Sequence, residues 1–180
     1  MNDNESLEIL DLVNVNDEVV GTMERERIYQ KGLSNLRDEE GVSFRVIDAF
    51  IKNTEGELFI PRRHPDKRLF PLRLDVSVGG HVTSGDSYEV TLKKEAKEEL
   101  NIDISNFTYK ILGKMSPFTN GVSAFTMVYE IESDETPNYN LEDFIEHFWL
   151  TPEELIARIE GEDLGKGNLP KIVKKFYLSN

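Results

Sequence analysis

Apolar and polar positions alternate along several short stretches of the chain, and such alternation is typical of half-buried β-strands. Turn residues at 14–17 separate the first two stretches, and turn residues at 53–56 separate the next two. Each arrangement predicts a β-hairpin, because Asn, Asp and Gly are favoured in tight turns. The expected strands are 7–13, 18–22, 42–52, 57–62, 107–114, 123–131 and 144–150.

Helical patterns lie between and after these strands. A short helix is expected at 23–31, with Gly32 beyond its end, so that the hairpin and this helix occupy about 7–32. Another helix follows Thr151, with Pro152 at its first position, and a C-terminal helix is expected at about 169–178. Mixed strands with two or three helices indicate an α+β fold, and the length predicts a single domain over 1–180.

The most informative segment begins where a β-branched run, 74–78, leads into Gly79 and Gly80. A short polar loop follows, and then a helix with an apolar stripe formed by Leu92, Ala96 and Leu100. Beside this stripe, three glutamates at positions i, i+3 and i+4 share one helix face. These glutamates are Glu95, Glu98 and Glu99.

Three like charges on one face need an explanation. A like-charged pair at i,i+4 destabilises a helix by roughly 0.2–0.5 kcal/mol. A divalent cation would reverse this effect, because Mg²⁺ takes carboxylate oxygens together with substrate phosphates. A solvated acidic surface is the other interpretation. The glycines favour a ligand, since they let the backbone approach the carboxylates closely.

The order of residues from Gly80 to Ile102 resembles the Nudix box, the signature of the Nudix hydrolase superfamily. The pattern is Gly, five residues, Glu, seven residues, Arg-Glu-apolar-any-Glu-Glu-any-Gly-apolar. Its spacing is intact here, and three positions differ: Asp86 replaces Glu, Lys94 replaces Arg and Asn101 replaces the last Gly.

This resemblance implies an α/β/α sandwich with a mixed sheet, and metal-dependent hydrolysis of a diphosphate bond in a small molecule, typically a nucleoside diphosphate linked to another group. By position, Glu95, Glu98 and Glu99 would bind Mg²⁺ or Mn²⁺, and Gly80 would offer a backbone carbonyl. Glu95 or Glu98 would act as, or orient, the catalytic base. The metal would neutralise the diphosphate and lower the pKa of bound water.

The differences from the pattern have physical consequences. Asn accepts positive φ more readily than other non-glycine residues, so Asn101 can still end the helix. In the family, the positions of Asp86 and Lys94 help to hold the loop against the helix. Lysine lacks the two-pronged geometry of arginine, so this supporting pair is expected to hold more loosely.

Several further residues are candidates for the site. Arg62, Arg63 and Lys67 form a basic cluster in an acidic chain, and they can either contact phosphate or remain solvated. Glu146 alternates with apolar residues on an expected strand, which is unusual for a carboxylate, although a solvated sheet edge also explains it.

The resemblance extends beyond the box, since two blocks, LEILDLVNVNDEVVG and GELFIPRR…K…DVSVGGHV, resemble the Nudix branch related to isopentenyl diphosphate isomerase. In those isomerases a histidine at the position of His81 binds a metal, two residues after a catalytic cysteine. Gly79 occupies the cysteine position here. Those isomerases also use two histidines from their N-terminal region, whereas the first histidine of this chain is His64. We therefore expect His81 to be a loop residue that packs or hydrogen-bonds beside the substrate site.

Composition limits the classes of partner that the protein can bind. A net charge of −13 argues against a nucleic-acid polymer but allows a small phosphorylated substrate, since a bound metal reverses the local field. The chain has no cysteine, no apolar run long enough for a membrane span and no signal-like start, so a cytoplasmic protein is expected. A homodimer is left open. The alternatives to a hydrolase are a Nudix module that binds a nucleotide without cleaving it and an isomerase-like enzyme.

Overall fold

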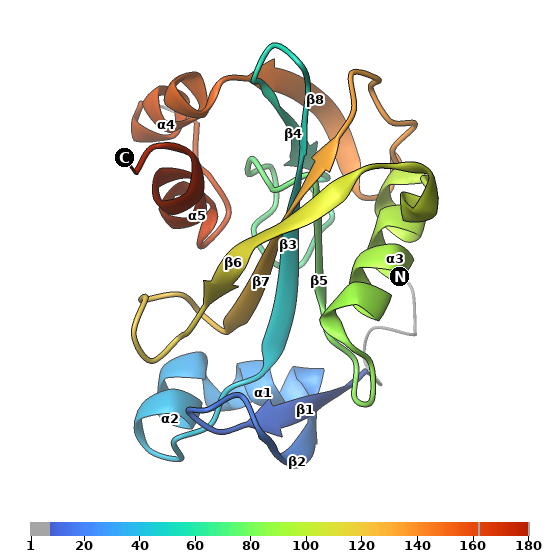
Figure 1. Ribbon diagram of the computed structural model, residues 1–180. Coiled ribbons are helices and arrows are strands. Elements are labelled where there is room, and N and C mark those ends of the chain that lie inside the picture. Colours follow the sequence, from blue (N-terminus) through green and yellow to red (C-terminus); the bar gives the residue numbers. More distant parts are fainter. Residues whose placement is uncertain (1–7, 162, 180) are drawn as a thin grey trace.

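A mixed six-stranded sheet lies at the centre of the computed structural model, which describes residues 8–161 and 163–179 (Figure 1). Neighbouring strands are antiparallel except for β3 and β7, which run parallel. One path through the sheet has the order β6 (Tyr109–Met115), β7 (Phe125–Glu132), β3 (Arg45–Lys52), β4 (Leu58–Arg63) and β8 (Phe144–Leu150), and β5 (Val78–His81) pairs with β3.

One edge of β3 is shared by two partners. Near its end, Lys52 pairs with Leu58 of β4, across the hairpin turn. Nearer its start, β3 pairs with β5, and this register places Asp48 opposite Gly79. The first glycines of the Nudix-like segment therefore lie inside the sheet, next to a strand that carries a carboxylate.

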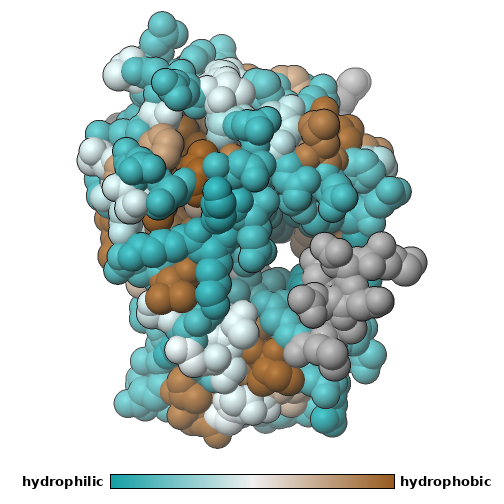
Figure 2. Space-filling model, turned by 90° about the vertical axis from the view of Figure 1, so that its right-hand side faces the viewer, coloured by the Kyte–Doolittle hydropathy of each residue, from teal (hydrophilic) through white to brown (hydrophobic). Residues whose placement is uncertain are grey.

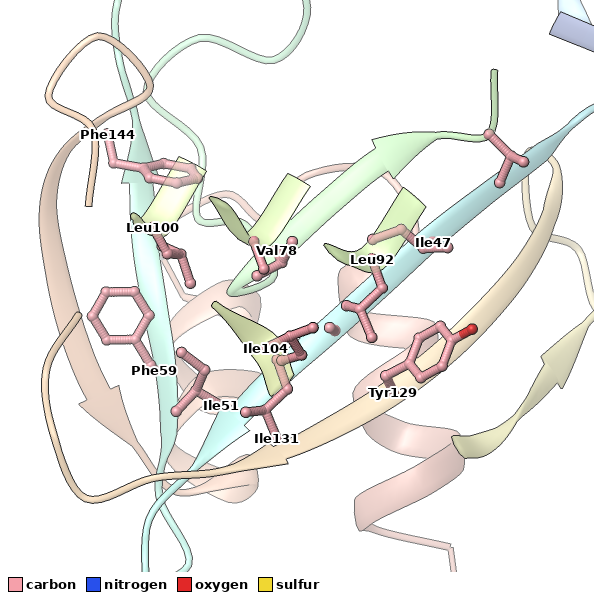
Figure 3. Packing of buried hydrophobic residues seen from close by; sticks show 13 residues of the cluster. Ile47, Ile51, Phe59, Val78, Leu92, Leu100, Ile104, Tyr129, Ile131 and Phe144 are labelled. Carbon is pink, nitrogen blue, oxygen red and sulfur yellow. The ribbon is translucent and has the colours of Figure 1, made fainter. Parts of the chain in front are cut away.

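Helices cover both faces of the sheet. Helix α3 (Tyr88–Leu100) lies on one side, and α4 (Pro152–Glu160) and α5 (Leu169–Tyr177) lie on the other (Figure 1). The α3 side is filled by a cluster of buried side chains (Figure 3) that includes Ile47, Ile51, Phe59, Val78, Leu92, Leu100, Ile104, Tyr129, Ile131 and Phe144. The opposite cluster includes Phe50, Leu58, Ile60, Leu155, Leu169, Ile172 and Val173.

The ends of α3 and α4 follow local rules. Ser87 accepts a hydrogen bond from the Val90 N–H and so caps the start of α3. Asn101 adopts a left-handed conformation, with φ of 56°, and ends the helix as expected. Thr151 and Glu154 form a capping box at the start of α4. A short 3₁₀ helix, Ile104–Asn106, follows α3 and contributes Ile104 to the core.

The N-terminal part of the chain packs as a separate layer against one end of the sheet (Figure 1). It consists of β1 (Ile9–Val13), β2 (Val19–Glu24), α1 (Arg25–Lys31) and α2 (Leu33–Asp38). One buried cluster joins this layer to the rest of the fold: it includes Leu10, Ile28 and Leu36 from the layer, and Phe44 and Ala124 from the main part. Strand β1 also reaches the loop before α3, where Ser84 donates a hydrogen bond to Asp11 at 2.6 Å.

The structure confirms the predicted α/β/α sandwich, its mixed sheet and the N-terminal hairpin. Most predicted strands and helices lie within a few residues of the observed ones. Leu7, the predicted first residue of the hairpin, lies outside the described residues. No helix in the described ranges is both long and apolar enough to span a membrane.

Two expectations need correction. Helix α2 was not predicted, because Gly32 was interpreted as a stop, whereas its positive φ links two short helices. The β-branched run at 74–78 lies mostly before β5, which extends over Val78–His81 because pairing with β3 overrides the low strand propensity of glycine. His81 is consequently the last residue of β5 rather than a loop residue.

Candidate active site

The glutamates of α3 lie against the backbone of β5. The Gly79 N–H donates a hydrogen bond to a carboxylate oxygen of Glu99 at 3.0 Å. A Cβ atom added to Gly80 would lie 2.2 Å from the carboxyl carbon of Glu95, so the Glu95 carboxyl group would have to leave this position. Glycine at position 80 therefore allows the Glu95 carboxyl group to lie directly against the backbone of β5.

The surroundings of these glutamates disfavour negative charge. Burial, followed by the charges of Glu98 and Glu8, raises the pKa of Glu95 to about 8. Burial also raises the pKa of Glu99 well above its usual value, with Glu95 and Asp75 adding to the effect, although the Gly79 N–H partly offsets it. A cation placed here would stabilise both ionised carboxylates.

Sequence reasoning missed three charged residues beside the same glycines. Asp48 lies on β3, and a Cβ at Gly79 would be 3.2 Å from its carboxylate and 3.5 Å from the Lys166 ammonium. Asp75 is 2% exposed and accepts hydrogen bonds from Arg63 at 2.6 Å and from Lys166 at 3.0 Å. Burial, with Asp75 contributing, raises the pKa of Asp48 to about 7.

The sequence marks these three residues with different clarity. Asp75 interrupts a β-branched apolar run, which is unusual enough to notice. Asp48 lies within an otherwise apolar stretch of β3, where one acid among hydrophobic residues could also have been noticed. Lys166 follows α4 in a polar loop, and no local pattern distinguishes it from solvated lysines.

We call Asp48, Asp75, Glu95, Glu99 and Lys166 the carboxylate cluster. Its oxygen donors, with the neighbouring backbone of β5, are of the type that Mg²⁺ prefers. Glu98 lies on the same helix but is exposed to solvent. Within residues 8–161 and 163–179, no three Asp, Glu, His or Cys side chains are arranged closely enough to form a ready-made metal site. The donor types therefore fit a hard cation, whereas their positions are not those of a closed ligand shell.

The substituted pair of the box forms a direct contact. The Lys94 ammonium donates to the Asp86 carboxylate at 2.6 Å and so connects the loop to α3. Lys94 is 55% exposed, so water screens this ion pair.

The three basic candidates all face carboxylates. Arg62 binds Asp163 through two hydrogen bonds of 2.6 and 2.7 Å and also contacts Glu146, which is exposed on β8. Arg63 binds Asp75, and Lys67 binds Asp143. Arg63 is thus joined to the carboxylate cluster, whereas Arg62 and Lys67 pair with acids outside it.

His81 contacts the N-terminal layer. Its Nε2 forms a hydrogen bond of 2.8 Å with the Tyr29 hydroxyl, and its ring stacks on Phe44 with 5.6 Å between centroids. Burial, followed by the positive charges of Arg25 and Lys166, lowers the pKa of the imidazole well below its usual value. His81 is therefore held neutral between β5 and α1.

The α3 side of the molecule carries mostly hydrophilic residues, with small hydrophobic areas between them (Figure 2). A polar face of this kind is compatible with a small charged ligand.

Comparison with known proteins gives consistent results. The sequence model of the NUDIX domain family matches residues 42–171 of this chain. An uncharacterized Nudix hydrolase of Nostoc is 47% identical over 173 residues, which cover 96% of this chain and 98% of that protein. A Nudix hydrolase of Deinococcus radiodurans is 46% identical and covers 94% of both chains.

A solved structure extends this agreement to three dimensions. The crystal structure of a Deinococcus radiodurans protein superposes with a TM-score of 0.83 at 44% identity, covering 94% of this chain and 99% of the other. The isopentenyl-diphosphate Delta-isomerase of Kocuria rhizophila is a more distant relative, 26% identical over 114 residues that cover 61% of this chain and 63% of that protein.

These matches confirm the family that the box pattern indicated. Members of the matched family hydrolyse phosphorus-containing anhydrides in small substrates and generally use a divalent metal. The domain match and the identity along nearly the whole chain show that this protein belongs to the Nudix hydrolase family.

Proposed function

We propose that this protein uses Mg²⁺ or Mn²⁺ to hydrolyse a diphosphate bond in a small molecule, typically one in which a nucleoside diphosphate is linked to another group. The observation that carries the proposal is the close approach of Glu95 and Glu99 to the backbone of Gly79 and Gly80. This approach concentrates carboxylates in surroundings that raise their pKa values, so a cation would gain strong electrostatic stabilisation there.

In this proposal Glu95, Glu98 and Glu99 hold the ion, and the Gly80 carbonyl is a further oxygen donor. When bound, the ion would neutralise the diphosphate and activate a water molecule. Glu95 or Glu98 would accept the proton of the attacking water or orient that water toward phosphorus. Phosphoryl transfer otherwise needs mainly positioning and charge stabilisation.

We assign contact with the outer phosphates to Arg62, Arg63 and Lys67. Each of them is bound to a carboxylate in the structure, so substrate phosphate would have to replace or share those partners. Arginine can bind phosphate through two parallel hydrogen bonds, which makes Arg62 and Arg63 the more specific candidates. His81 and Glu146 would act only indirectly, through Tyr29 and Arg62.

A panel of nucleoside diphosphate sugars, ADP-ribose, dinucleotides, nucleoside triphosphates and isoprenoid diphosphates tests the proposal. Phosphate products should appear with Mg²⁺ or Mn²⁺ and disappear with EDTA. Glu98→Gln should reduce the rate by about 100-fold or more, since transition-state charge stabilisation and proton transfer are each worth that much. Glu89→Gln is the matched control, because Glu89 pairs with Lys93 on the exposed side of the same helix.

Two other outcomes are informative. Mg²⁺ and nucleotide binding without cleavage of any compound would support a non-catalytic Nudix module. Formation of dimethylallyl diphosphate from isopentenyl diphosphate would support isomerase-like chemistry, which we do not expect because Gly79 occupies the position of the isomerase cysteine.

A further inference from the structure

Lys166 enters the carboxylate cluster from a distant part of the chain. Its backbone is fixed, because the Lys166 N–H donates to the Leu74 carbonyl at 2.8 Å and its carbonyl accepts from the Leu169 N–H at 2.9 Å. The adjoining Gly165 pairs with Leu74 in a parallel bridge. The side chain is thereby directed from the segment between α4 and α5 toward Asp75 and Gly79.

The ammonium of Lys166 is surrounded by acids. It donates to Asp75 at 3.0 Å, and its side chain is only 28% exposed. Burial opposes its charge, but Asp75, and then Asp48 and Glu99, outweigh this effect and raise the pKa of Lys166 above its usual value. The lysine therefore remains protonated within the cluster.

Asp75 does not need this lysine as its only counter-ion. Arg63 already binds Asp75 at 2.6 Å, and the same guanidinium is held in place by the Leu69 carbonyl at 3.1 Å. A Cβ at Gly79 would lie 3.5 Å from the Lys166 ammonium, so this charge lies beside the backbone that binds Glu99. Lys166 thus carries a positive charge to the place where a cation would bind.

We propose that Lys166 is a built-in counter-cation of the carboxylate cluster, a positioning residue that weakens binding of the divalent cation and so sets its affinity. The inference rests on the proposed metal site and adds a specific role for a residue outside the box. Without an ion, the ammonium offsets part of the repulsion among the acids. With an ion present, the two positive charges repel each other across a short distance.

Magnesium titration by calorimetry, without substrate, tests this role. Lys166→Met should lower the dissociation constant for Mg²⁺ by about 10-fold, the scale expected for a unit charge several ångströms from the ion. Lys166→Arg keeps the charge and should stay within about 2-fold of the parent. Lys174→Met removes an exposed lysine that pairs with Glu160 on α5 and should match the parent.

The possible outcomes separate the two proposals. If the parent binds Mg²⁺ and Lys166→Met binds it equally or more weakly, this inference is wrong while the metal site stands. If neither protein binds Mg²⁺, the metal site fails and this inference fails with it. Circular dichroism of the metal-free variants checks folding, and Lys166→Gln replaces Lys166→Met should the latter not fold. A purely structural lysine would change the melting temperature without tightening Mg²⁺ binding.

Discussion

Two groups of charged side chains in this protein have opposite charge balance. In one, the Asp17 side chain is only 8% exposed and binds Arg45 at 2.6 Å, Lys114 at 2.7 Å and the Tyr88 hydroxyl at 3.0 Å. Burial alone would raise the pKa of Asp17, but its hydrogen bonds to Lys114 and Arg45 outweigh this and lower it. One acid with two cations is fully satisfied.

In the carboxylate cluster the ratio is reversed, since four acids lie near three cations: Lys166, Arg63 and, near Glu95, Arg25. The pKa values of Asp48, Glu95 and Glu99 are all raised. A group of acids that the fold brings together without enough counter-charge costs stability, and such sites are typically functional. The comparison teaches that the sign of the pKa shift separates a structural ion pair from a candidate cation site.

The largest expected effect comes from adding a side chain at Gly80, where Glu95 lies against the strand. Gly80→Ala would place a Cβ atom 2.2 Å from the Glu95 carboxyl group, so that carboxyl group must move away from β5. Displacing a catalytic group by about 1 Å can cost about 100-fold in rate, and we expect a loss of at least that size in diphosphate hydrolysis. Gly21→Ala is the control, because nothing lies within 4 Å of its Cβ position. Equal activity of the two variants would contradict the account.

Breaking the satisfied group should cost stability rather than activity. Arg45→Met leaves Asp17 with one cation fewer and should lower the free energy of unfolding by about 1–3 kcal/mol. Urea unfolding in EDTA measures this. Glu95→Gln, in the unsatisfied group, should leave the free energy of unfolding unchanged or raise it under the same conditions. The comparison fails if both substitutions destabilise the metal-free protein to the same extent.

The two groups should also respond to pH in opposite directions. The folded pKa of Glu95 is raised from 4.5 to about 8, so its contribution is fully present below about pH 4.5 and is lost as the pH rises to about 8. Over this window, the free energy of unfolding of the metal-free parent should fall by roughly 1–2 kcal/mol relative to that of Glu95→Gln, because solvent screening reduces the full effect of the pKa shift.

Asp17 has a lowered pKa, so its contribution is present above the unfolded value near 3.8 and is lost as the pH falls. The parent should therefore be more stable to unfolding than Asp17→Asn at neutral pH, and this difference should disappear in acid. Urea titrations at a series of pH values measure both trends. Parallel pH curves for parent, Glu95→Gln and Asp17→Asn would remove the distinction between the groups.

The smallest effect is expected at the loop that supports the site. Asp86→Glu combined with Lys94→Arg restores the residues of the box pattern and permits a two-pronged contact. Because Lys94 is largely exposed, the rate of hydrolysis should rise by no more than a few-fold. Steady-state kinetics of the double variant and both single variants measure this change. A gain of about 100-fold would mean that this pair, rather than the charge balance, limits the rate.

Local sequence patterns predicted the parts of the site that lie close together in the chain. A 3.6-residue period was enough to place Glu95, Glu98 and Glu99 on one helix, and the glycines marked the close approach. The fold class followed from the strand and helix periods and from the box resemblance.

The rest of the cluster depends on contacts between distant segments. Asp48 becomes a neighbour of Gly79 only through the β3–β5 register, and Lys166 reaches Asp75 across 91 positions of sequence. Likewise, Arg62 binds Asp163 and Lys67 binds Asp143, and both of these carboxylates lie far along the chain. No local pattern encodes such pairings, because they arise only when the sheet and its covering helices assemble.

The central claim is that the α3 carboxylates bind a divalent cation, and thermal melting with EDTA and with millimolar Mg²⁺ at matched ionic strength tests it most directly. Parent protein should be stabilised by Mg²⁺, since the ion binds the folded site by mass action, while Glu95→Gln and Glu98→Gln should lose most of that gain. Lys93→Gln should behave like the parent, because Lys93 pairs with Glu89 away from the cluster. An equal Mg²⁺ shift in the parent and both glutamate variants would show that these carboxylates are ordinary surface charges.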